Sequence, residues 1–240
     1  MTYCMAFRLD EGLIFLSDTR TNAGVDNVGT YRKLHVLRAG EDRLFVLQSA
    51  GSLATTHEVL DRINADLAMP GDHESLANIS HLHEAAIYIG RLGREISQRH
   101  SAALGSSATA TFIVGGQIAG ERADIFLVYP EGNYIRVSDE RPFLQIGESK
   151  YGKFMLELAV HAQVRLEGAI KIALSSMVST AHANLSVGPP YDLGVYLNGS
   201  LELIETRVEA DSPYLAALTQ VWMTHFLDAI SQLPPLPTSG

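Results

Sequence analysis

The order of strand-like and helix-like segments constrains the fold of this chain more than any other feature of its sequence. Apolar residues alternate in short runs, then recur at helical spacing, then alternate again, so that strands and helices come in blocks. The expected strands are residues 2–8, 12–17, 31–37, 43–49, 108–114, 123–129, 134–137, 191–197 and 201–206. The expected helices are residues 52–67, 80–103, 151–164, 167–182 and 213–233.

This block order favours one arrangement of layers. Strands joined by short turns pair antiparallel, and the first four strands are expected to form one antiparallel group. Paired helices between such groups cover the outer faces of two packed sheets. The sequence therefore predicts the α+β class, as a four-layer αββα sandwich of two antiparallel sheets between helical layers. One domain is expected over residues 1–240, with a C-terminal helix at about 213–233 and a proline-rich tail at 234–240.

Composition excludes several classes of protein. Hydrophobic residues make up 46% and charged residues 19% of the chain, which is typical of globular proteins, and no apolar run is long enough to span a membrane. The net charge of −9, without a cluster of Lys or Arg, argues against nucleic-acid binding. No secretory signal is visible, and the single cysteine, Cys4, suits a reducing compartment and is expected to be a buried thiol. A cytoplasmic protein is predicted.

The second residue is a candidate nucleophile. Removal of Met1 would leave Thr2 with a hydroxyl group and, on the same residue, a free α-amine that can accept the hydroxyl proton. An α-amine with an ordinary pKa of about 8 is partly neutral at physiological pH and so suits a general base. While Met1 remains, the nitrogen of Thr2 is an amide, and the intact chain would be a zymogen. A threonine in this position is common, however, and alone it favours no function.

Three further segments, taken with Thr2, carry a resemblance to a known family. They are Asp18-Thr19-Arg20, Arg32-Lys33-Leu34-His35 and Ser49-Ala50-Gly51-Ser52, the last of which leads into a helix. The set resembles the signature of proteasome-type β subunits, which are N-terminal-nucleophile hydrolases. The opening Thr2-Tyr3-Cys4, residues 17–26 and residues 184–190 are most similar to the bacterial branch called Anbu, the ancestral β subunit. The resemblance covers essentially the whole chain, and the combination is more specific than any of its parts.

The resemblance implies a role for each residue of the signature. Thr2 would attack the substrate carbonyl, Lys33 would lower the proton affinity of the Thr2 amine and hydroxyl, and Asp18 would hold Lys33 charged and oriented. The backbone N–H at Gly51 would bind the oxyanion, and Ser149 matches the region of the family's supporting serine. Without Thr2, Asp18 and Lys33 would be interpreted as a turn carboxylate and a solvated lysine. Gly51 would then be a strand end and Ser149 a helix cap.

The chain departs from the family pattern at one place. Where the family has an aspartate followed three residues later by a serine, this chain has Asn184 and Val187. An asparagine side chain donates and accepts hydrogen bonds but carries no negative charge, so the tuning of the Thr2 amine lacks its usual carboxylate. Reduced activity is an expected consequence, which Ser186 could offset only in part.

The family pattern also assigns a substrate pocket. The residues expected to line the pocket for the substrate residue before the cleaved bond are Tyr31, His35, Ser49 and Leu53. Because this set mixes polar and apolar side chains, we expect little selectivity.

Two other motifs are weaker. His81 and His83, with Asp72 and His73 nearby, suggest a metal cluster, but on a helix the first two would point about 200° apart and no i, i+4 pair is present. Residues 115–120 are glycine-rich but lack the lysine and hydroxyl residue of a phosphate loop, and a turn between strands explains them. No metal and no cofactor are predicted.

Three functions remain open at this stage. The first is a self-compartmentalising threonine peptidase that acts on peptides or proteins. The second is an amidase or γ-glutamyl-type transferase acting on a small amide, and the third is a weakly active or inactive assembling scaffold. The resemblance implies a homo-oligomer in the form of a ring or ring-like spiral, and the sequence does not indicate whether an ATP-driven partner exists.

Overall fold

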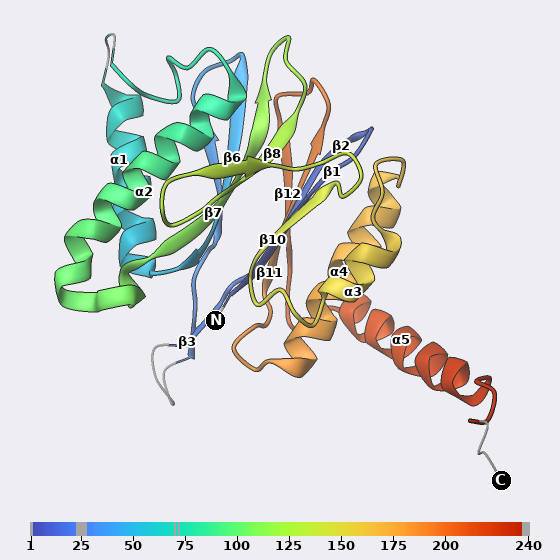
Figure 1. Ribbon diagram of the computed structural model, residues 1–240. Coiled ribbons are helices and arrows are strands. Elements are labelled where there is room, and N and C mark those ends of the chain that lie inside the picture. Colours follow the sequence, from blue (N-terminus) through green and yellow to red (C-terminus); the bar gives the residue numbers. More distant parts are fainter. Residues whose placement is uncertain (1, 23–27, 70, 72, 237–240) are drawn as a thin grey trace.

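Two antiparallel sheets packed face to face, each covered on its outer side by two helices, form the body of the protein (Figure 1). The computed structural model describes residues 2–22, 28–69, 71 and 73–236. Met1, residues 23–26 of the Anbu-like stretch, Asp72 and the last four residues of the predicted tail lie outside the described ranges. The four-layer αββα sandwich predicted from the block order is the observed architecture.

The first sheet contains the N-terminal strand. Its order is β10-β1-β2-β11-β12, and every neighbouring pair is antiparallel. The strands are β1 (Tyr3–Arg8), β2 (Gly12–Asp18), β10 (Phe143–Gly147), β11 (Tyr191–Leu197) and β12 (Leu203–Val208). In this register Cys4 pairs with Ser17, so the start of β1 lies beside the end of β2.

The second sheet has the order β5-β6-β7-β8-β9 and is also antiparallel throughout. Its strands are β5 (Leu34–Arg38), β6 (Arg43–Gly51), β7 (Ala110–Ile118), β8 (Asp124–Val128) and β9 (Tyr134–Arg136). A separate two-stranded pair, β3 (Arg20–Asn22) and β4 (Val28–Thr30), joins the two sheets along the chain.

The first four expected strands do not form one group. The hairpin β1–β2 belongs to the first sheet and the hairpin β5–β6 to the second. The reason is that the β2 side chains Leu13 and Phe15 pack against Leu44 and Val46 of β6 in a shared core, so the two hairpins stack instead of pairing edge to edge.

The helices have clear starts. They are α1 (Leu53–Ala68), α2 (Leu82–Leu104), α3 (Lys153–Ala159), α4 (Leu166–Ala183) and α5 (Pro213–Ser231), with a short 3₁₀ helix, η1 (Gly105–Ala108), after α2. At the start of α1 the Ser52 hydroxyl accepts a hydrogen bond from the Thr55 N–H, and at the start of α2 the Glu84 carboxylate accepts from the His81 N–H. Such caps satisfy N–H groups that have no partner within the helix.

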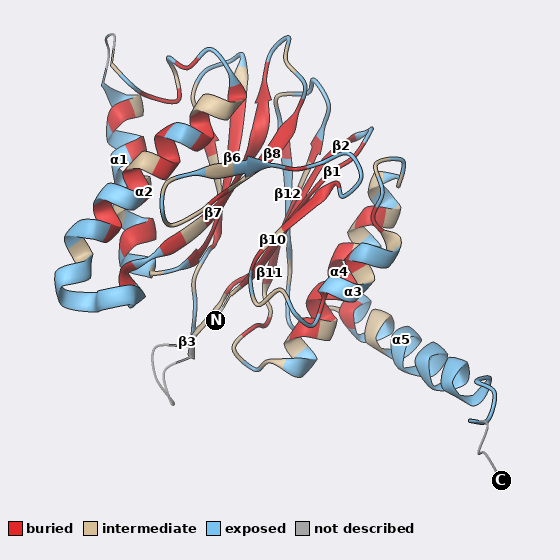
Figure 2. Cartoon of the chain, in the orientation of Figure 1, coloured by how far each residue is buried: buried red, intermediate tan, exposed pale blue. Residues whose placement is uncertain are grey.

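Three cores hold the four layers together (Figure 2). One lies between the second sheet and α1 and α2, one between the first sheet and α3 and α4, and one between the two sheets. Side chains alternate accordingly along β1, where Tyr3 and Met5 face the helices while Cys4 and Ala6 face the other sheet.

Several elements differ from the sequence prediction. The short strands β3 and β4 and the 3₁₀ helix η1 were not expected. Strand β10 was not expected, although Phe143 packs on its helix side and Leu144 and Ile146 on its sheet side. Helix α3 ends at Ala159 rather than continuing to residue 164. Here the carbonyl of Ala162 accepts a hydrogen bond from the Asp10 N–H at 2.8 Å, so the turn after β1 binds the segment that would have extended the helix.

Helix α5 projects away from the body, and most of its surface is exposed (Figure 2). Only Leu215 is buried, while Trp222, Phe226 and Ile230 of the expected apolar stripe stay 45%, 63% and 48% exposed. The start of the stripe, at Leu215 and Leu218, packs against the core beneath α3 and α4, and the rest of the stripe is not part of the internal core. No helix within the described ranges has both the length and the apolar character needed to cross a lipid bilayer.

Candidate active site

Thr2 lies at the start of β1, at the end of the sandwich where the N-terminus is marked in Figure 1. Since side chains alternate along a strand and Cys4 faces the second sheet, the Thr2 side chain lies on that same side. The Thr2 carbonyl accepts a hydrogen bond of 2.6 Å from the Glu148 N–H. Gly147 approaches so closely that a Cβ there would lie 1.9 Å from the Thr2 carbonyl oxygen. Thr2 is thus held through its backbone.

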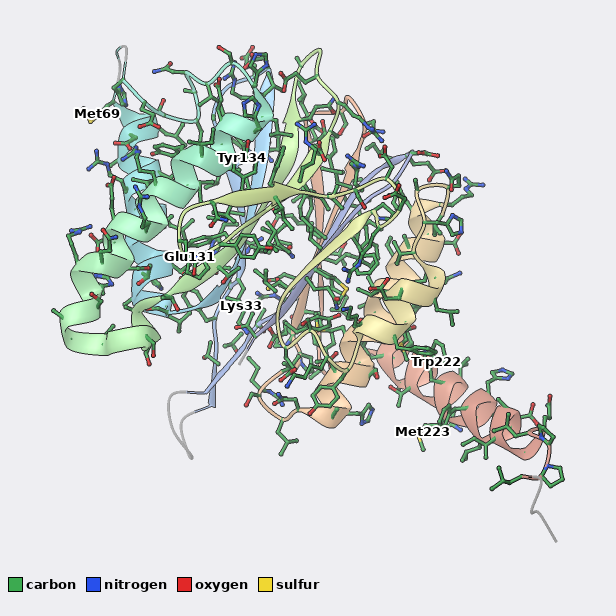
Figure 3. The ribbon with its side chains drawn as sticks, in the orientation of Figure 1. Lys33, Met69, Glu131, Tyr134, Trp222 and Met223 are labelled. Carbon is green, nitrogen blue, oxygen red and sulfur yellow. The ribbon has the colours of Figure 1, made fainter. Side chains whose placement is uncertain are left out.

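A buried ion pair lies directly beside this end of β1. The Lys33 ammonium donates to Asp18 Oδ1 at 2.7 Å, and the side chains are 2% and 0% exposed. The same carboxylate oxygen accepts a 3.0 Å hydrogen bond from the N–H of Tyr3, the residue that follows Thr2. Lys33 also donates to the Arg20 carbonyl at 2.7 Å. In Figure 3, Lys33 lies in the interior of the fold. The structure therefore brings Lys33, Asp18 and the Thr2 segment together.

Opposing effects act on the Asp18 carboxyl. Burial raises its pKa above the ordinary value, whereas the Lys33 ammonium and the N–H groups of Tyr3 and Gly188 favour the charged form and oppose that rise. With a cation at 2.7 Å and two backbone donors, the pair has the hydrogen bonds that a buried charge requires.

Cys4 is the buried thiol that its sequence position predicted. Burial raises its pKa, against the opposing effect of the Lys33 charge. Its sulfur donates to the Ser49 carbonyl at 3.7 Å. A thiol kept protonated in this way is a poor nucleophile.

Gly51 ends β6 and directly precedes the cap of α1. Its φ of +113° suits glycine, and a Cβ there would lie 2.4 Å from the Thr109 carbonyl oxygen, so a side chain is excluded. Ser49, two residues earlier, contacts Cys4 through its carbonyl, and its N–H donates to the Lys33 carbonyl at 3.1 Å. Gly51 lies two residues after Ser49 along β6, and Thr2 lies two residues before Cys4 along β1. Gly51 and Thr2 are therefore each two residues from the contact between Cys4 and Ser49.

Asn184 and Glu148 form a second contact next to Thr2. Asn184 follows the last residue of α4, and its side-chain Nδ2 donates to Glu148 Oε2 at 3.0 Å. Its Oδ1 accepts from the Ser186 N–H at 3.0 Å. The sequence reasoning did not identify Glu148. Its position between Gly147 and Ser149, in a segment already assigned to the site, was the one available signal.

Ser149 and Val187 have less direct roles in this geometry. The Ser149 N–H donates to the Gly147 carbonyl at 3.0 Å, and α3 begins only at Lys153, so Ser149 is not its cap. Val187 is fully buried in the core beneath α3 and α4, where an apolar side chain packs. Gly188, also missed from sequence, donates its N–H to Asp18 Oδ2 at 3.3 Å.

The predicted pocket residues lie partly together. The Tyr31 ring contacts His57 of α1 in a tilted arrangement, with ring centroids 4.9 Å apart and an angle of 32° between the ring planes, and its centroid lies 6.5 Å from that of the His35 ring. Sequence reasoning missed His57. Ser49 is buried, and Leu53 is 39% exposed at the first turn of α1.

His35 is uncharged at neutral pH. Burial lowers its pKa to about 4, and the nearby charges of Arg32 and His57 act in the same direction. Within the described part of the chain its buried Nε2 has no hydrogen-bond partner.

Two expectations about other motifs need correction. His81 precedes α2 instead of lying on it, so the His81 and His83 rings stack 5.7 Å apart rather than pointing in different directions. Among the described residues no group of three His, Cys, Asp or Glu side chains could hold a metal. Gly115 and Gly116 lie inside β7, paired with β6, and not in a turn. Glycine is needed at position 116 because a side chain there would collide with the Leu44 carbonyl of the neighbouring strand.

Solved structures close to this one share its fold over nearly its whole length. The Anbu Gly-1 mutant from Hyphomicrobium sp. strain MC1 is 40% identical with a TM-score of 0.92, covering 99% of this chain and 100% of that chain. Anbu (ancestral beta-subunit) from Yersinia bercovieri is 38% identical with a TM-score of 0.92 and the same coverage. The helical assembly of the Anbu complex from Pseudomonas aeruginosa is 39% identical with a TM-score of 0.92, covering 98% of each chain. No protein-family model and no curated protein matches the chain.

Proposed function

The chain belongs to the Anbu family of proteasome-like β subunits, and on that premise we propose that it is a threonine hydrolase whose nucleophile is Thr2 after removal of Met1. The proposed substrate is an amide bond in a peptide or protein. The residues proposed to carry the reaction are Thr2, Asp18, Lys33, Gly51, Ser149 and Asn184.

One observation supports this proposal above the others. The Asp18 oxygen that accepts from Lys33 also accepts from the N–H that follows Thr2. The Asp18 carboxylate therefore links the buried Lys33 ammonium by hydrogen bonds to the backbone next to the proposed nucleophile. A positive charge so placed lowers the proton affinity of nearby groups, which is the role that an N-terminal hydroxyl and amine need in order to react at neutral pH.

The proposed reaction has two steps. The Thr2 Oγ gives its proton to the Thr2 α-amine and attacks the amide carbon, while the Gly51 N–H binds the oxyanion. The ammonium then gives its proton to the leaving nitrogen, and the C–N bond breaks to leave an ester on Thr2. Water, deprotonated by the same amine, hydrolyses this ester and releases the acid. The chemistry requires no cofactor.

The proposed pocket is compatible with two classes of substrate. Tyr31, His35, Ser49 and Leu53 are proposed to receive the side chain before the cleaved bond, with His57 added because its ring contacts that of Tyr31. Both a peptide and a small amide, such as a γ-glutamyl amide, present the required carbonyl. The alternative of a scaffold with little activity is favoured by one feature, the neutral Asn184 in place of a carboxylate.

We also propose that the subunits assemble through α5. A groove of about 680 Å³ runs between α3, α4 and α5. It is lined mainly by apolar side chains, among them Phe154, Leu158, Trp222 and Phe226. These side chains stay exposed in the single chain, and large exposed apolar patches mark interaction sites. The proposed occupant is a second copy of the chain, since a related Anbu complex forms a helical assembly.

Mass spectrometry after electrophile labelling tests the proposed activity. Protein processed to begin at Thr2 should react with an epoxyketone or β-lactone at Thr2, and Thr2→Ala should abolish both labelling and turnover. Unchanged turnover by Thr2→Ala would rule out the threonine mechanism. A substrate panel of unfolded proteins, short peptides and γ-glutamyl amides then separates peptidase from amidase. A chain that keeps Met1 in its native host would favour the scaffold.

A further inference from the structure

Glu148 binds Thr2 through its backbone and Asn184 through its side chain. Its N–H donates to the Thr2 carbonyl at 2.6 Å, which fixes the residue next to the proposed nucleophile. Its carboxylate accepts a hydrogen bond from Asn184 Nδ2 at 3.0 Å. Asn184 is the residue at which the chain lacks the carboxylate that the family pattern leads one to expect.

Charge balance distinguishes Glu148 from Asp18. The Asp18 charge is matched by Lys33 and by two backbone N–H groups. The ion pairs found within the described ranges include none that joins Glu148 to Lys or Arg, and its side-chain hydrogen bond comes from a neutral amide. Glu148 therefore brings a negative charge to the Thr2 end of β1 that the Lys33–Asp18 pair does not neutralise.

We propose that Glu148, held by Asn184, is the positioning residue that supplies the missing negative charge to the α-amine of processed Thr2. This inference rests on the proposed function. Asn184 then acts as a support for the carboxylate instead of a replacement for it. The carboxylate favours the ammonium form that arises when Thr2 Oγ gives up its proton, and so counteracts the opposite effect of Lys33.

The sign of the effect is definite. A nearby negative charge raises the proton affinity of an amine, so removal of the charge should make the Thr2 amine titrate at lower pH. We expect Glu148→Gln to shift this titration down by about one pH unit.

The titration can be measured without any turnover. Processed protein is treated with trace acetic anhydride across the pH range, and mass spectrometry follows acetylation of the Thr2 amine, which reacts only when unprotonated. The matched control is Glu202→Gln, which removes an exposed carboxylate beside the β11–β12 turn, at the opposite end of the sheet from Asp18. Equal titration in Glu148→Gln and Glu202→Gln would overturn the inference.

A double variant that moves the carboxylate from residue 148 to residue 184 separates an electrostatic role of Glu148 from a structural one. In the double variant Glu148→Gln with Asn184→Asp, the carboxylate returns on the partner residue, and we expect the titration to recover toward the wild-type curve. A fold disturbed by loss of Glu148 would not recover in this way. If Glu148→Gln does not fold, Glu148→Ala, which also removes the carboxylate, should shift the amine titration down in the same way, and no shift would contradict the inference.

The two proposals can fail separately. Acetylation reports the basicity of the Thr2 amine whether or not the protein is an enzyme. Wild-type protein that is not labelled by electrophiles at any pH would therefore count against the threonine hydrolase alone. The Glu148 inference is decided by the acetylation curves.

Discussion

The ammonium of Lys33 lies 2.7 Å from the carboxylate of Asp18 in a region that excludes solvent almost completely. A buried ion pair of this kind contributes little net stability compared with an apolar pair of the same size, but removal of one partner leaves the other charge without compensation. The Lys33–Asp18 pair therefore couples the stability of the fold to the chemistry proposed for Thr2.

Substitution of one member of the pair should destabilise the protein strongly. We expect Lys33→Met to lower the free energy of unfolding by about 3–5 kcal/mol, because Asp18 is then buried without a cation. The double variant with Asp18→Asn should recover part of this loss, while electrophile labelling of Thr2 stays abolished in both. Urea denaturation measures the first effect, and equal losses in the single and double variants would contradict it.

Gly51 should not tolerate a side chain. Gly51→Ala combines a φ of +113° with a contact of 2.4 Å between the new Cβ and the Thr109 carbonyl, and we expect a loss of about 1–3 kcal/mol of unfolding free energy together with loss of Thr2 labelling. Gly120→Ala is the control, since Gly120 also has positive φ, +86°, but nothing lies within 4 Å of the position that a Cβ would take there. Chemical denaturation should show the smaller loss for Gly120→Ala, and equal losses would rule out the contact with Thr109 as the cause.

Acid should destabilise the protein in part through His35. Its pKa is about 4 in the fold against an ordinary 6.5, so the stability that His35 contributes is present above pH 6.5 and is lost as the pH falls toward 4. The loss amounts to up to about 3 kcal/mol. His35→Asn, which cannot be protonated, should show a shallower loss of unfolding free energy over this range.

The exposed His161→Asn is the matched control for the acid experiment. Its unfolding free energy should follow the wild-type curve. A His35→Asn curve parallel to wild type between pH 6.5 and 4 would show that His35 does not contribute to the acid sensitivity.

A charge in the apolar groove should disrupt assembly. Phe226→Asp places a carboxylate on a side chain that is 63% exposed in the single chain and lines the groove between α3, α4 and α5. We expect sedimentation to show smaller species for this variant. Ile135→Asp, at an exposed apolar residue of β9, should leave the size distribution as in wild type. The same distribution for Phe226→Asp would argue against the α5 interface.

Periodicity predicted most of the fold. The helices α1, α2 and α4 were found from apolar spacing because each has one buried face. Helix α5 was found from its apolar stripe, although most of that stripe is exposed in the single chain. Strands β1 and β2 were found as short apolar runs bounded by turn residues. Strand β10 was missed because it is short and apolar on both faces, so its pattern does not alternate. The division of the first four strands between two sheets depends on long-range packing, which local spacing does not encode.

The candidate site was only partly accessible to sequence reasoning. Family motifs pointed to Asp18 and Lys33, which the structure brings into contact, while the roles of these residues remain predictions. Glu148, Gly188 and His57 were missed. Their contacts depend on which of several neighbouring residues turns toward Thr2, Asp18 or Tyr31, and the sequence does not encode this locally. For Glu148, the positive φ of Gly147 just before it interrupts the strand alternation from which the direction of its side chain could be inferred.

The backbone hold on Thr2 has a consequence for maturation. Its carbonyl is fixed by Glu148 and the following N–H by Asp18, so the proposed nucleophile is kept in place by contacts on its C-terminal side. Trimming of a single residue by an aminopeptidase would then expose an amine that is already correctly oriented. Activation of this kind needs no conformational rearrangement, and an unprocessed and a mature molecule should differ in chemistry while remaining superimposable in shape.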